Sequence, residues 1–216
     1  MLNHFLKRLL DIIFSILGIV ICSPFLALLP ILIKIESSGP ALFKQSRIGK
    51  NGVLFKIFKF RSMVNNAEKK GTGLFNYAND DRVTKLGKTM RKYSLDELPQ
   101  FFNILKGDMS FVGPRPPVHY ELGEYDLLPP AYKRRFSVKP GLTSFAQIRG
   151  RNTLSWDEKV AHDNDYIDSF ARWGIFLDII IILITIKKVI TFEGAYELEG
   201  NFEADMNIQK TKKPTP

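Results

Sequence analysis

Two adjacent carboxylates, Asp96 and Glu97, are the residues of this 216-residue chain best suited to do chemistry. They lie in the segment Ser94-Leu-Asp-Glu-Leu-Pro-Gln100, directly before apolar residues at helical spacing, so both fall at the positive end of a helix. That end stabilises an ionised carboxylate and also binds phosphate groups. Adjacent carboxylates are common at helix starts without any catalytic role, so their surroundings decide whether this pair is a site.

Cations gather around this pair in the sequence. Arg91 lies five residues before Asp96, and the rigid loop Gly113-Pro114-Arg115-Pro116 carries a second arginine. Lys59 and Arg61 occupy alternate positions, so they share one face of a predicted strand. Guanidinium groups match phosphate oxygens, and phosphoryl transfer depends largely on positioning and on charge stabilisation. The residue types therefore favour a site that handles phosphates.

The helix that positions the carboxylates is predicted over residues 95–106, where leucine and phenylalanine recur at helical spacing and Gly107 supplies a stop. Ser94 and Glu97 match the S-x-x-E capping box, so a cap is the non-catalytic alternative for Glu97. Pro99 fits only a first helical turn, which allows a later start, at Leu98.

Four further elements are predicted around this helix. Residues 53–62 alternate and are rich in phenylalanine, which indicates a strand led by a turn at residues 49–52. Residues 84–93 predict a basic helix, and residues 64–82 predict a polar loop with a short helix.

Composition restricts the class of protein. The chain has 31 Lys and Arg against 22 Asp and Glu, and 45% of its residues are hydrophobic, which excludes a disordered or fibrous chain. A single cysteine, Cys22, excludes an internal disulfide. Eight of the nine net positive charges fall within residues 37–110, which predicts an anionic partner: nucleic acid, lipid headgroups or a phosphorylated substrate.

An uncharged run extends from Ile12 to Ile33. As a straight helix it would be about 33 Å long, enough to cross a bilayer. Ser23 and Pro24 interrupt it, and basic residues flank both ends, which favours a helix that enters the membrane, breaks and returns to the cytoplasmic side. The Ser23 hydroxyl is then available to a freed backbone carbonyl. A kinked spanning helix is the alternative.

A second apolar stretch covers residues 173–190. Its uncharged core is too short to span a bilayer, so it predicts either a helix lying at the membrane interface or a buried strand or core helix. The basic run Lys133-Arg-Arg135 indicates a solvated face or a contact with anionic headgroups.

Several ordered motifs resemble the bacterial sugar transferases, the small monotopic phosphoglycosyl transferases. The resemblance covers about residues 3–190, with Ser144 as a departure where the family usually has glycine. It rests on KRLLD (7–11), the Ser23-Pro24 break, QSRIG (45–49), FKIFKFRSM (55–63), SLDELPQ (94–100), NILKGDMSFVGPRP (103–116), KPGLTSFAQIRGRN (139–152) and the W-x(6)-D-x-x-Y pattern from Trp156 to Tyr166.

The resemblance implies transfer of a sugar 1-phosphate from a UDP-sugar to undecaprenyl phosphate, with release of UMP, as the first membrane step of polysaccharide or glycoconjugate synthesis. Asp96 would be the nucleophile that forms an aspartyl-phosphosugar, Glu97 its partner, and Mg²⁺ would bind Asp96 and the diphosphate. The groups implied for phosphate or lipid headgroup binding are Lys59, Arg61, Arg91, Arg115, Arg151 and Asp163, with Gly113, Pro114 and Pro116 in the nucleotide loop.

The fold expected from these observations is mixed α/β and helix-rich. Residues 1–36 form a re-entrant membrane hairpin, residues 37–190 a compact catalytic domain with a short sheet, and residues 191–216 a tail. We expect a monotopic protein on the cytoplasmic face of the bacterial inner membrane, in contact with phospholipids and without nucleic acid; a homodimer stays open.

Two other functions stay open at this point. One is a membrane-tethered, non-enzymatic binder of anionic lipid or nucleic acid. The other is an enzyme that transfers directly, with Asp96 or Glu97 acting as a base on the lipid phosphate.

Overall fold

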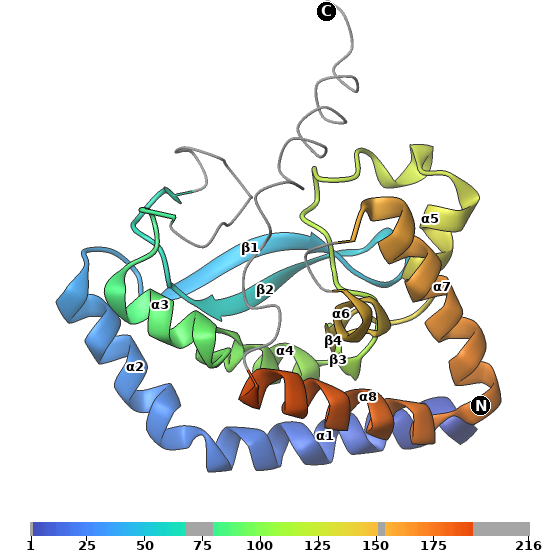
Figure 1. The fold of residues 1–216 in the computed structure, drawn as a ribbon, viewed down its shortest axis with the longest axis horizontal. Helices are drawn as coiled ribbons and strands as arrows, with labels where there is room; N and C mark the ends of the chain where they lie inside the picture. Colours follow the sequence, from blue (N-terminus) through green and yellow to red (C-terminus); the bar gives the residue numbers. More distant parts are fainter. Residues whose placement is uncertain (1, 68–79, 151–153, 192–216) are drawn as a thin grey trace, which may run out of the picture.

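The computed structural model describes residues 2–67, 80–150 and 154–191, and the fold is given for these residues (Figure 1). They form a helix-rich mixed α/β structure with two small sheets, which confirms the predicted fold class. The helices α1, α2 and α8 run along one edge of the molecule, with the strands β1 and β2 above them (Figure 1).

Two N-terminal helices form a bent pair. Helix α1 spans Leu2–Ile21 and α2 spans Ser23–Glu36, and their axes differ by 60° at the predicted break. The Ser23 hydroxyl donates a 2.8 Å hydrogen bond to the Val20 carbonyl, as expected where proline interrupts the helical ladder. No single helix in the described residues is apolar over enough length to cross a bilayer, although α1 and α2 together meet that criterion.

The main sheet is an antiparallel hairpin of β1 (Leu42–Ile48) and β2 (Leu54–Phe60), joined by a short 3-10 turn, η1 (Lys50–Gly52). The predicted strand and its leading turn are confirmed. Strand β1 was missed because its sequence, LFKQSRI, shows no clean alternation; its partner strand holds it through the ladder.

The segment with the two carboxylates follows the predicted basic helix. Helix α3 spans Lys85–Lys92, and Thr84 caps it by accepting from the Gly87 N–H. A 3-10 turn, η3 (Leu95–Glu97), then leads into α4 (Gln100–Lys106), which ends at left-handed Gly107. The chain therefore breaks near Pro99, and the single helix predicted over 95–106 is two pieces.

A second sheet pairs two short parallel strands, β3 (Ser110–Val112) and β4 (Gly141–Thr143). The connection between them holds η4 (Tyr125–Leu127), α5 (Pro130–Arg134) and η5 (Arg135–Ser137). Helix α6 (Phe145–Arg149) follows β4 and is capped by Ser144, whose hydroxyl accepts from the Gln147 N–H. The departure at Ser144 is thus accommodated as a helix cap.

Two long helices complete the described residues. Helix α7 spans Trp156–Trp173 and begins with a full capping box at Ser155, while α8 spans Ile175–Ile190. The second apolar stretch is therefore a helix and not a strand. It turns sharply out of α7 at Gly174, whose positive φ of 55° places the two helices at an angle.

Polar residues of α1 attach this helix to α8. The Lys7 ammonium group donates hydrogen bonds to the Asp178 carboxylate and, at 2.9 Å, to the Val112 carbonyl. Tyr166 of α7 donates to the other Asp178 oxygen at 2.8 Å. Lys7, which the sequence places at a membrane flank, is thus committed to a contact within the protein.

The next turn of α1 attaches to α4 and β3. Arg8 donates to two carbonyl groups in the last turn of α4, at 2.6 and 2.8 Å. Asp11 accepts from the Ser110 hydroxyl and the Phe111 N–H, both at 3.0 Å. Helix α1 is therefore an integral part of the fold that carries the carboxylates.

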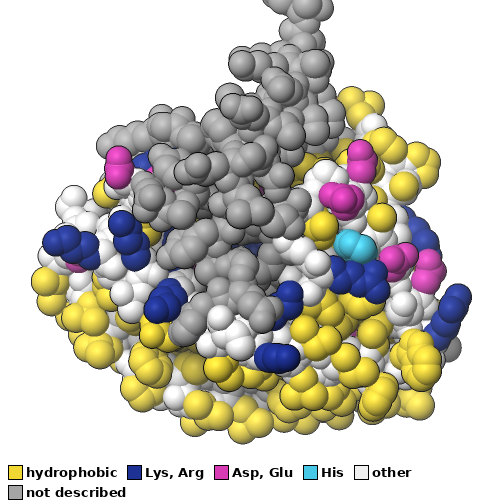
Figure 2. All heavy atoms as spheres, viewed as in Figure 1, with side chains coloured by type: hydrophobic (Ala, Val, Ile, Leu, Met, Phe, Trp, Pro, Cys, Tyr) yellow, Lys and Arg dark blue, Asp and Glu magenta, His cyan; other side chains and the backbone are white. Residues whose placement is uncertain are grey.

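The outward faces of α1, α2 and α8 are apolar. Figure 2 shows hydrophobic side chains along the margin where Figure 1 places these helices, with lysine and arginine side chains above them. The exposed members include Phe14, Val20, Phe25, Ile35, Phe176 and Leu183. So large an apolar face on a folded protein indicates a surface that contacts lipid or another apolar partner.

Candidate functional site

The predicted carboxylates lie together in the η3 turn. Ser94 precedes it with a left-handed backbone, φ 56°, and its side chain makes no capping hydrogen bond. The capping-box alternative for Glu97 is therefore wrong, because Ser94 turns the chain sharply between α3 and η3 instead of capping a helix. Asp96 is 8% exposed.

Glu97 is held by two cations from different parts of the fold. Lys59 of β2 and Arg115 of the loop after β3 each donate to Oε1 of Glu97 at 2.8 Å. Burial opposes ionisation of this carboxyl, but the charges and hydrogen bonds of Arg115 and Lys59 outweigh it and hold the pKa of Glu97 well below its ordinary value. Glu97 is thus a fixed anion that positions both cations.

Asp96 differs from Glu97 both in its hydrogen bonding and in the direction of its pKa shift. Among the residues that the structure describes, none donates a hydrogen bond to its carboxylate. Burial, with repulsion from Glu97, raises the pKa of Asp96, although Lys59, Arg91 and Arg115 lower it in part. Two neighbouring carboxylates whose pKa values move apart are typical of sites in which each has a separate role. Asp96 is therefore the carboxylate whose oxygens are available for chemistry.

Lys59 shares this buried environment. Burial lowers the pKa of Lys59, while the nearby Glu97 charge raises it in part. Its position is fixed from α4, where the Asn103 side chain accepts from the Phe58 N–H at 2.9 Å and donates to the Lys56 carbonyl at 2.7 Å. Asn103 was missed as a site-building residue; its place in the NILKGD motif was the only sign in the sequence.

Arg91 lies on α3, behind the carboxylates. Its Nε donates to the Ser62 hydroxyl at 2.8 Å, and its charge acts on Asp96. Gly87 makes this approach of α3 close, because a Cβ on Gly87 would lie 2.0 Å from the Ser62 carbonyl oxygen.

We therefore expect Gly87→Ala to push α3 away from Ser62 and to displace Arg91. The expected loss is about 1–3 kcal/mol in the free energy of unfolding, typical of overpacking. Chemical denaturation measures it. Lys88→Ala, on the exposed face of the same helix, is the control; wild-type stability of Gly87→Ala would contradict the packing argument.

The loop that carries Arg115 is held by its backbone. The Gly113 N–H donates to the Thr143 carbonyl, and the Gly141 N–H donates to the Pro114 carbonyl, both at 3.0 Å. A Cβ on Gly113 would lie 2.3 Å from the Lys139 carbonyl oxygen, so only glycine fits this crossing. Arg47 donates to the Pro116 carbonyl at 2.9 Å.

Asp163 supports the loop that carries Arg115 through a contact with Arg135. It pairs with Arg135 at 2.8 Å, and both side chains are 2% exposed. The Arg135 guanidinium also donates to the Arg115 carbonyl at 2.8 Å. The structure thus places Asp163 behind the loop in a buried ion pair. The expectation that residues 133–135 form a solvated face is wrong for Arg135, which is buried.

Arg61 does not join the carboxylates. Strand β2 ends at Phe60, so the alternation that would place Arg61 beside Lys59 stops there. The Arg61 guanidinium is buried at the end of α2, where it donates to the carbonyls of Ile33, Ser37 and Ser38. Ser23 and Pro24 form the helix break described above. Arg151 lies outside the described residues.

A divalent cation fits the Asp96 side of the site. Mg²⁺ in phosphate-handling sites is commonly bound by one or two carboxylates together with substrate phosphates. The described residues contain no cluster of three or more acidic, histidine or cysteine ligands. The Asp96 carboxylate accepts no hydrogen bond from the described residues. It therefore matches a site in which one carboxylate and the substrate phosphates hold the cation.

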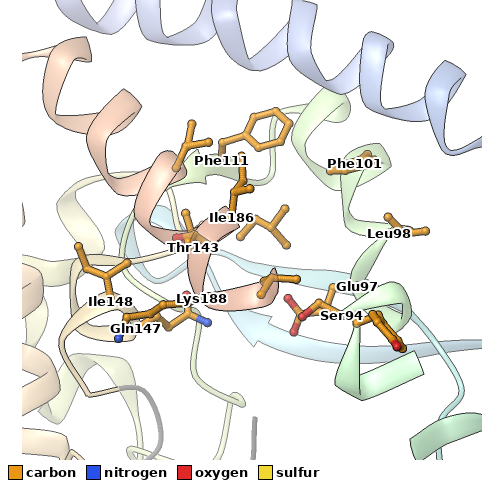
Figure 3. A pocket seen from close by; sticks show the side chains of 15 residues that line it. Ser94, Glu97, Leu98, Phe101, Phe111, Thr143, Gln147, Ile148, Ile186 and Lys188 are labelled. Atoms are coloured by element: carbon orange, nitrogen blue, oxygen red, sulfur yellow. Dashed lines mark hydrogen bonds between the residues drawn. The ribbon is translucent and has the colours of Figure 1, made fainter. Parts of the chain in front are cut away.

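An apolar cavity of about 350 Å³ opens next to Glu97. It lies between η3 and α4 on one side and α8 on the other, and Figure 3 shows the Glu97 side chain extending toward α8. The site therefore combines a charged group of side chains with an apolar space beside it.

Comparison with known proteins places this geometry in context. The family described as bacterial sugar transferase matches residues 2–192. A UDP-N-acetylgalactosamine-undecaprenyl-phosphate N-acetylgalactosaminephosphotransferase of Aeromonas hydrophila is 42% identical over 194 residues, which cover 88% of this chain and 45% of that protein. The galactosyl transferase CpsE of Streptococcus agalactiae serotype III is 46% identical over 200 residues, covering 88% and 43%.

A shorter relative matches along most of its length. The uncharacterized sugar transferase EpsL of Bacillus subtilis is 41% identical over 190 residues, covering 88% of this chain and 89% of that protein. The chain thus spans less than half the length of the first two relatives and most of the third.

Proposed function

Because the chain belongs to the bacterial sugar transferase family, we propose that it transfers a sugar 1-phosphate from a UDP-sugar to undecaprenyl phosphate and releases UMP. The observation that carries this proposal is the difference in hydrogen bonding between the two carboxylates. Glu97 is fixed by Lys59 and Arg115, while Asp96 lies beside the same cations without a hydrogen bond from any described residue.

In the first step we propose, an Asp96 oxygen attacks the phosphorus that carries the sugar. A bond forms between this oxygen and phosphorus, and the bond to the bridging oxygen of the diphosphate breaks. UMP leaves with the electron pair, and the phosphosugar stays on Asp96. An ionised carboxylate needs no base for this attack.

In the second step, an oxygen of the lipid phosphate attacks the same phosphorus. The bond to Asp96 breaks, the carboxylate is regenerated and the sugar diphospholipid leaves. Lys59 and Arg115, aimed by Glu97, stabilise the charge on the phosphoryl oxygens in both steps. Asp96 and the substrate diphosphate would hold Mg²⁺, which neutralises negative charge on the phosphates.

The two N-terminal helices and α8 support a place at the membrane. We propose that their apolar faces lie in the cytoplasmic leaflet of the bacterial inner membrane among phospholipids, with α1 and α2 as a re-entrant pair and α8 at the interface. Under this proposal the carboxylates lie at the level of the lipid phosphates.

Isotope exchange tests the two-step reaction. Enzyme incubated with UDP-sugar and labelled UMP, without lipid acceptor, should move label into UDP-sugar, because the covalent step is reversible. A screen of UDP-sugars for UMP release in the presence of undecaprenyl phosphate identifies the donor beforehand. Turnover without exchange would support direct transfer, with a carboxylate acting as a base on the lipid phosphate.

The pH profile gives a second test. Because burial raises the pKa of Asp96 and only the ionised form attacks, kcat/KM should fall about tenfold per pH unit below that pKa. The acid limb should therefore lie above the ordinary aspartate value of about 3.9.

Removing the Arg115 charge should shift the acid limb of the pH profile to higher pH. The Arg115 charge lowers the pKa of Asp96, so the Arg115→Ala limb should lie at higher pH than the wild-type limb. Incubation at each pH followed by assay at neutral pH separates titration from unfolding. A wild-type limb at or below the ordinary value contradicts the assignment of Asp96.

A further inference from the structure

The cavity beside Glu97, which we call the α4–α8 cavity, has walls suited to hydrocarbon. Its apolar lining includes Leu98, Phe101, Phe111, Leu142, Ile186 and Val189. A volume of about 350 Å³ is at the lower end of the range for ligand pockets. Figure 3 shows the side chains of Phe111 and Ile186 between α8 and α4.

Three polar side chains in the wall are already bonded within the protein. The hydroxyls of Thr143 and Thr185 are 2.6 Å apart, and Thr185 also donates to the Ile181 carbonyl at 2.8 Å. These threonines therefore have no strong need for hydrogen bonds from a sugar or a nucleotide. Glu97 is likewise bound to Lys59 and Arg115. Gln147 also lines the cavity, and its side-chain oxygen has no hydrogen-bond partner among the described residues, so the case for hydrocarbon rests on the apolar majority of the lining.

The two sides of the cavity differ in a way that matches a phosphorylated lipid. On one side are Glu97 and the cations that it holds. On the other, Ile186 lines the cavity and is also half exposed on the apolar outer face of α8.

The wall also continues into α1. The Phe111 ring contacts the Phe14 ring edge-on, with 6.2 Å between centroids. Gly18 lies so close to the Phe101 ring that a Cβ there would be 2.8 Å from it. The cavity thus joins the charged site to the apolar face formed by α1 and α8.

We propose that the α4–α8 cavity binds the phosphate-proximal isoprene units of the polyprenyl phosphate acceptor, with the phosphate at Lys59 and Arg115. This inference rests on the proposed function and names a binding site for one substrate. The cavity is small, so the remainder of the chain passes along α8 into the bilayer. In the bilayer these units are already out of water, so the protein contributes through van der Waals packing of the cavity wall against the units nearest the phosphate.

Filling the cavity should weaken lipid use selectively. Ile186→Trp places a larger side chain in the cavity, while Leu183→Trp adds the same ring to α8 at a residue that does not line it. Because the larger ring takes up the space of the isoprene units, we expect Ile186→Trp to raise the KM for undecaprenyl phosphate at least about tenfold, with the KM for UDP-sugar unchanged. Leu183→Trp should match wild type. Steady-state kinetics in lipid nanodiscs measure these values.

A binding measurement without UDP-sugar separates this inference from the proposed function. Undecaprenyl phosphate should raise the melting temperature of wild type and Leu183→Trp but not of Ile186→Trp, and phosphatidic acid should have a smaller effect. This pattern without any UDP-sugar turnover would support the cavity and contradict the proposed reaction. Equal responses of both variants, or equal stabilisation by phosphatidic acid, would overturn the cavity assignment.

Discussion

Asp96→Asn should abolish sugar-phosphate transfer, with a loss of at least about 10⁴-fold in kcat, as when a covalent nucleophile is removed. The amide is nearly the same size as the carboxylate, so the cations around Glu97 keep their positions. UMP release and UMP exchange should disappear together, because both depend on the same attack by Asp96.

The same variant should be more stable than wild type at neutral pH. The folded protein raises the pKa of Asp96, so the ionised carboxylate is less favourable in the folded state than in the unfolded state at any pH above the ordinary aspartate value. Asparagine removes this cost, and the gain should vanish at pH values below the ordinary pKa. Thermal unfolding at neutral and acidic pH measures the difference.

Asp126→Asn is the matched control, because Asp126 is exposed and its carboxylate lies on a distant 3-10 turn. It should change neither activity nor stability. If Asp96→Asn turned over UDP-sugar at the wild-type rate, Asp96 would not be the nucleophile. If wild type itself turned over no UDP-sugar, the chain would be a membrane-tethered binder of anionic ligands.

The second large effect is expected for Arg115→Ala. Arg115 donates to Glu97 and lies beside Asp96, so its removal takes one charge from the phosphate site and leaves Glu97 with Lys59 alone. We expect kcat to fall about 10²–10³-fold, the usual cost of losing a preorganised transition-state donor.

Arg115→Lys should recover only part of this loss, because an ammonium group cannot reproduce the fork of a guanidinium. Arg134→Ala is the control: Arg134 pairs with Asp168 on the surface, and its loss should leave kcat unchanged. An Arg115→Ala variant with wild-type kcat would remove Arg115 from the mechanism.

Local patterns predicted the elements that depend on nearby residues. Helix α3, strand β2, the stop at Gly107 and the break at Ser23 follow from spacing and from proline and glycine chemistry, and the structure confirms them. The resemblance to the bacterial sugar transferases is confirmed by the family match.

The predictions that were wrong concern residues whose contact partners are distant in sequence. Ser94 matches a capping box, but Glu97 is instead bound by Lys59 and Arg115, which are distant in sequence. Arg135 belongs to a basic run, yet its partner Asp163 lies on α7 and buries it. A rule that considers one segment at a time contains no information on such pairs.

Helix α1 presents Lys7, Arg8 and Asp11 to the rest of the fold and apolar side chains outward. No linker therefore separates the apolar face of α1 from the carboxylates. If this face lies in the bilayer as proposed, the fold sets the height of Asp96 relative to the lipid headgroups, and we expect turnover to depend on bilayer thickness and headgroup depth.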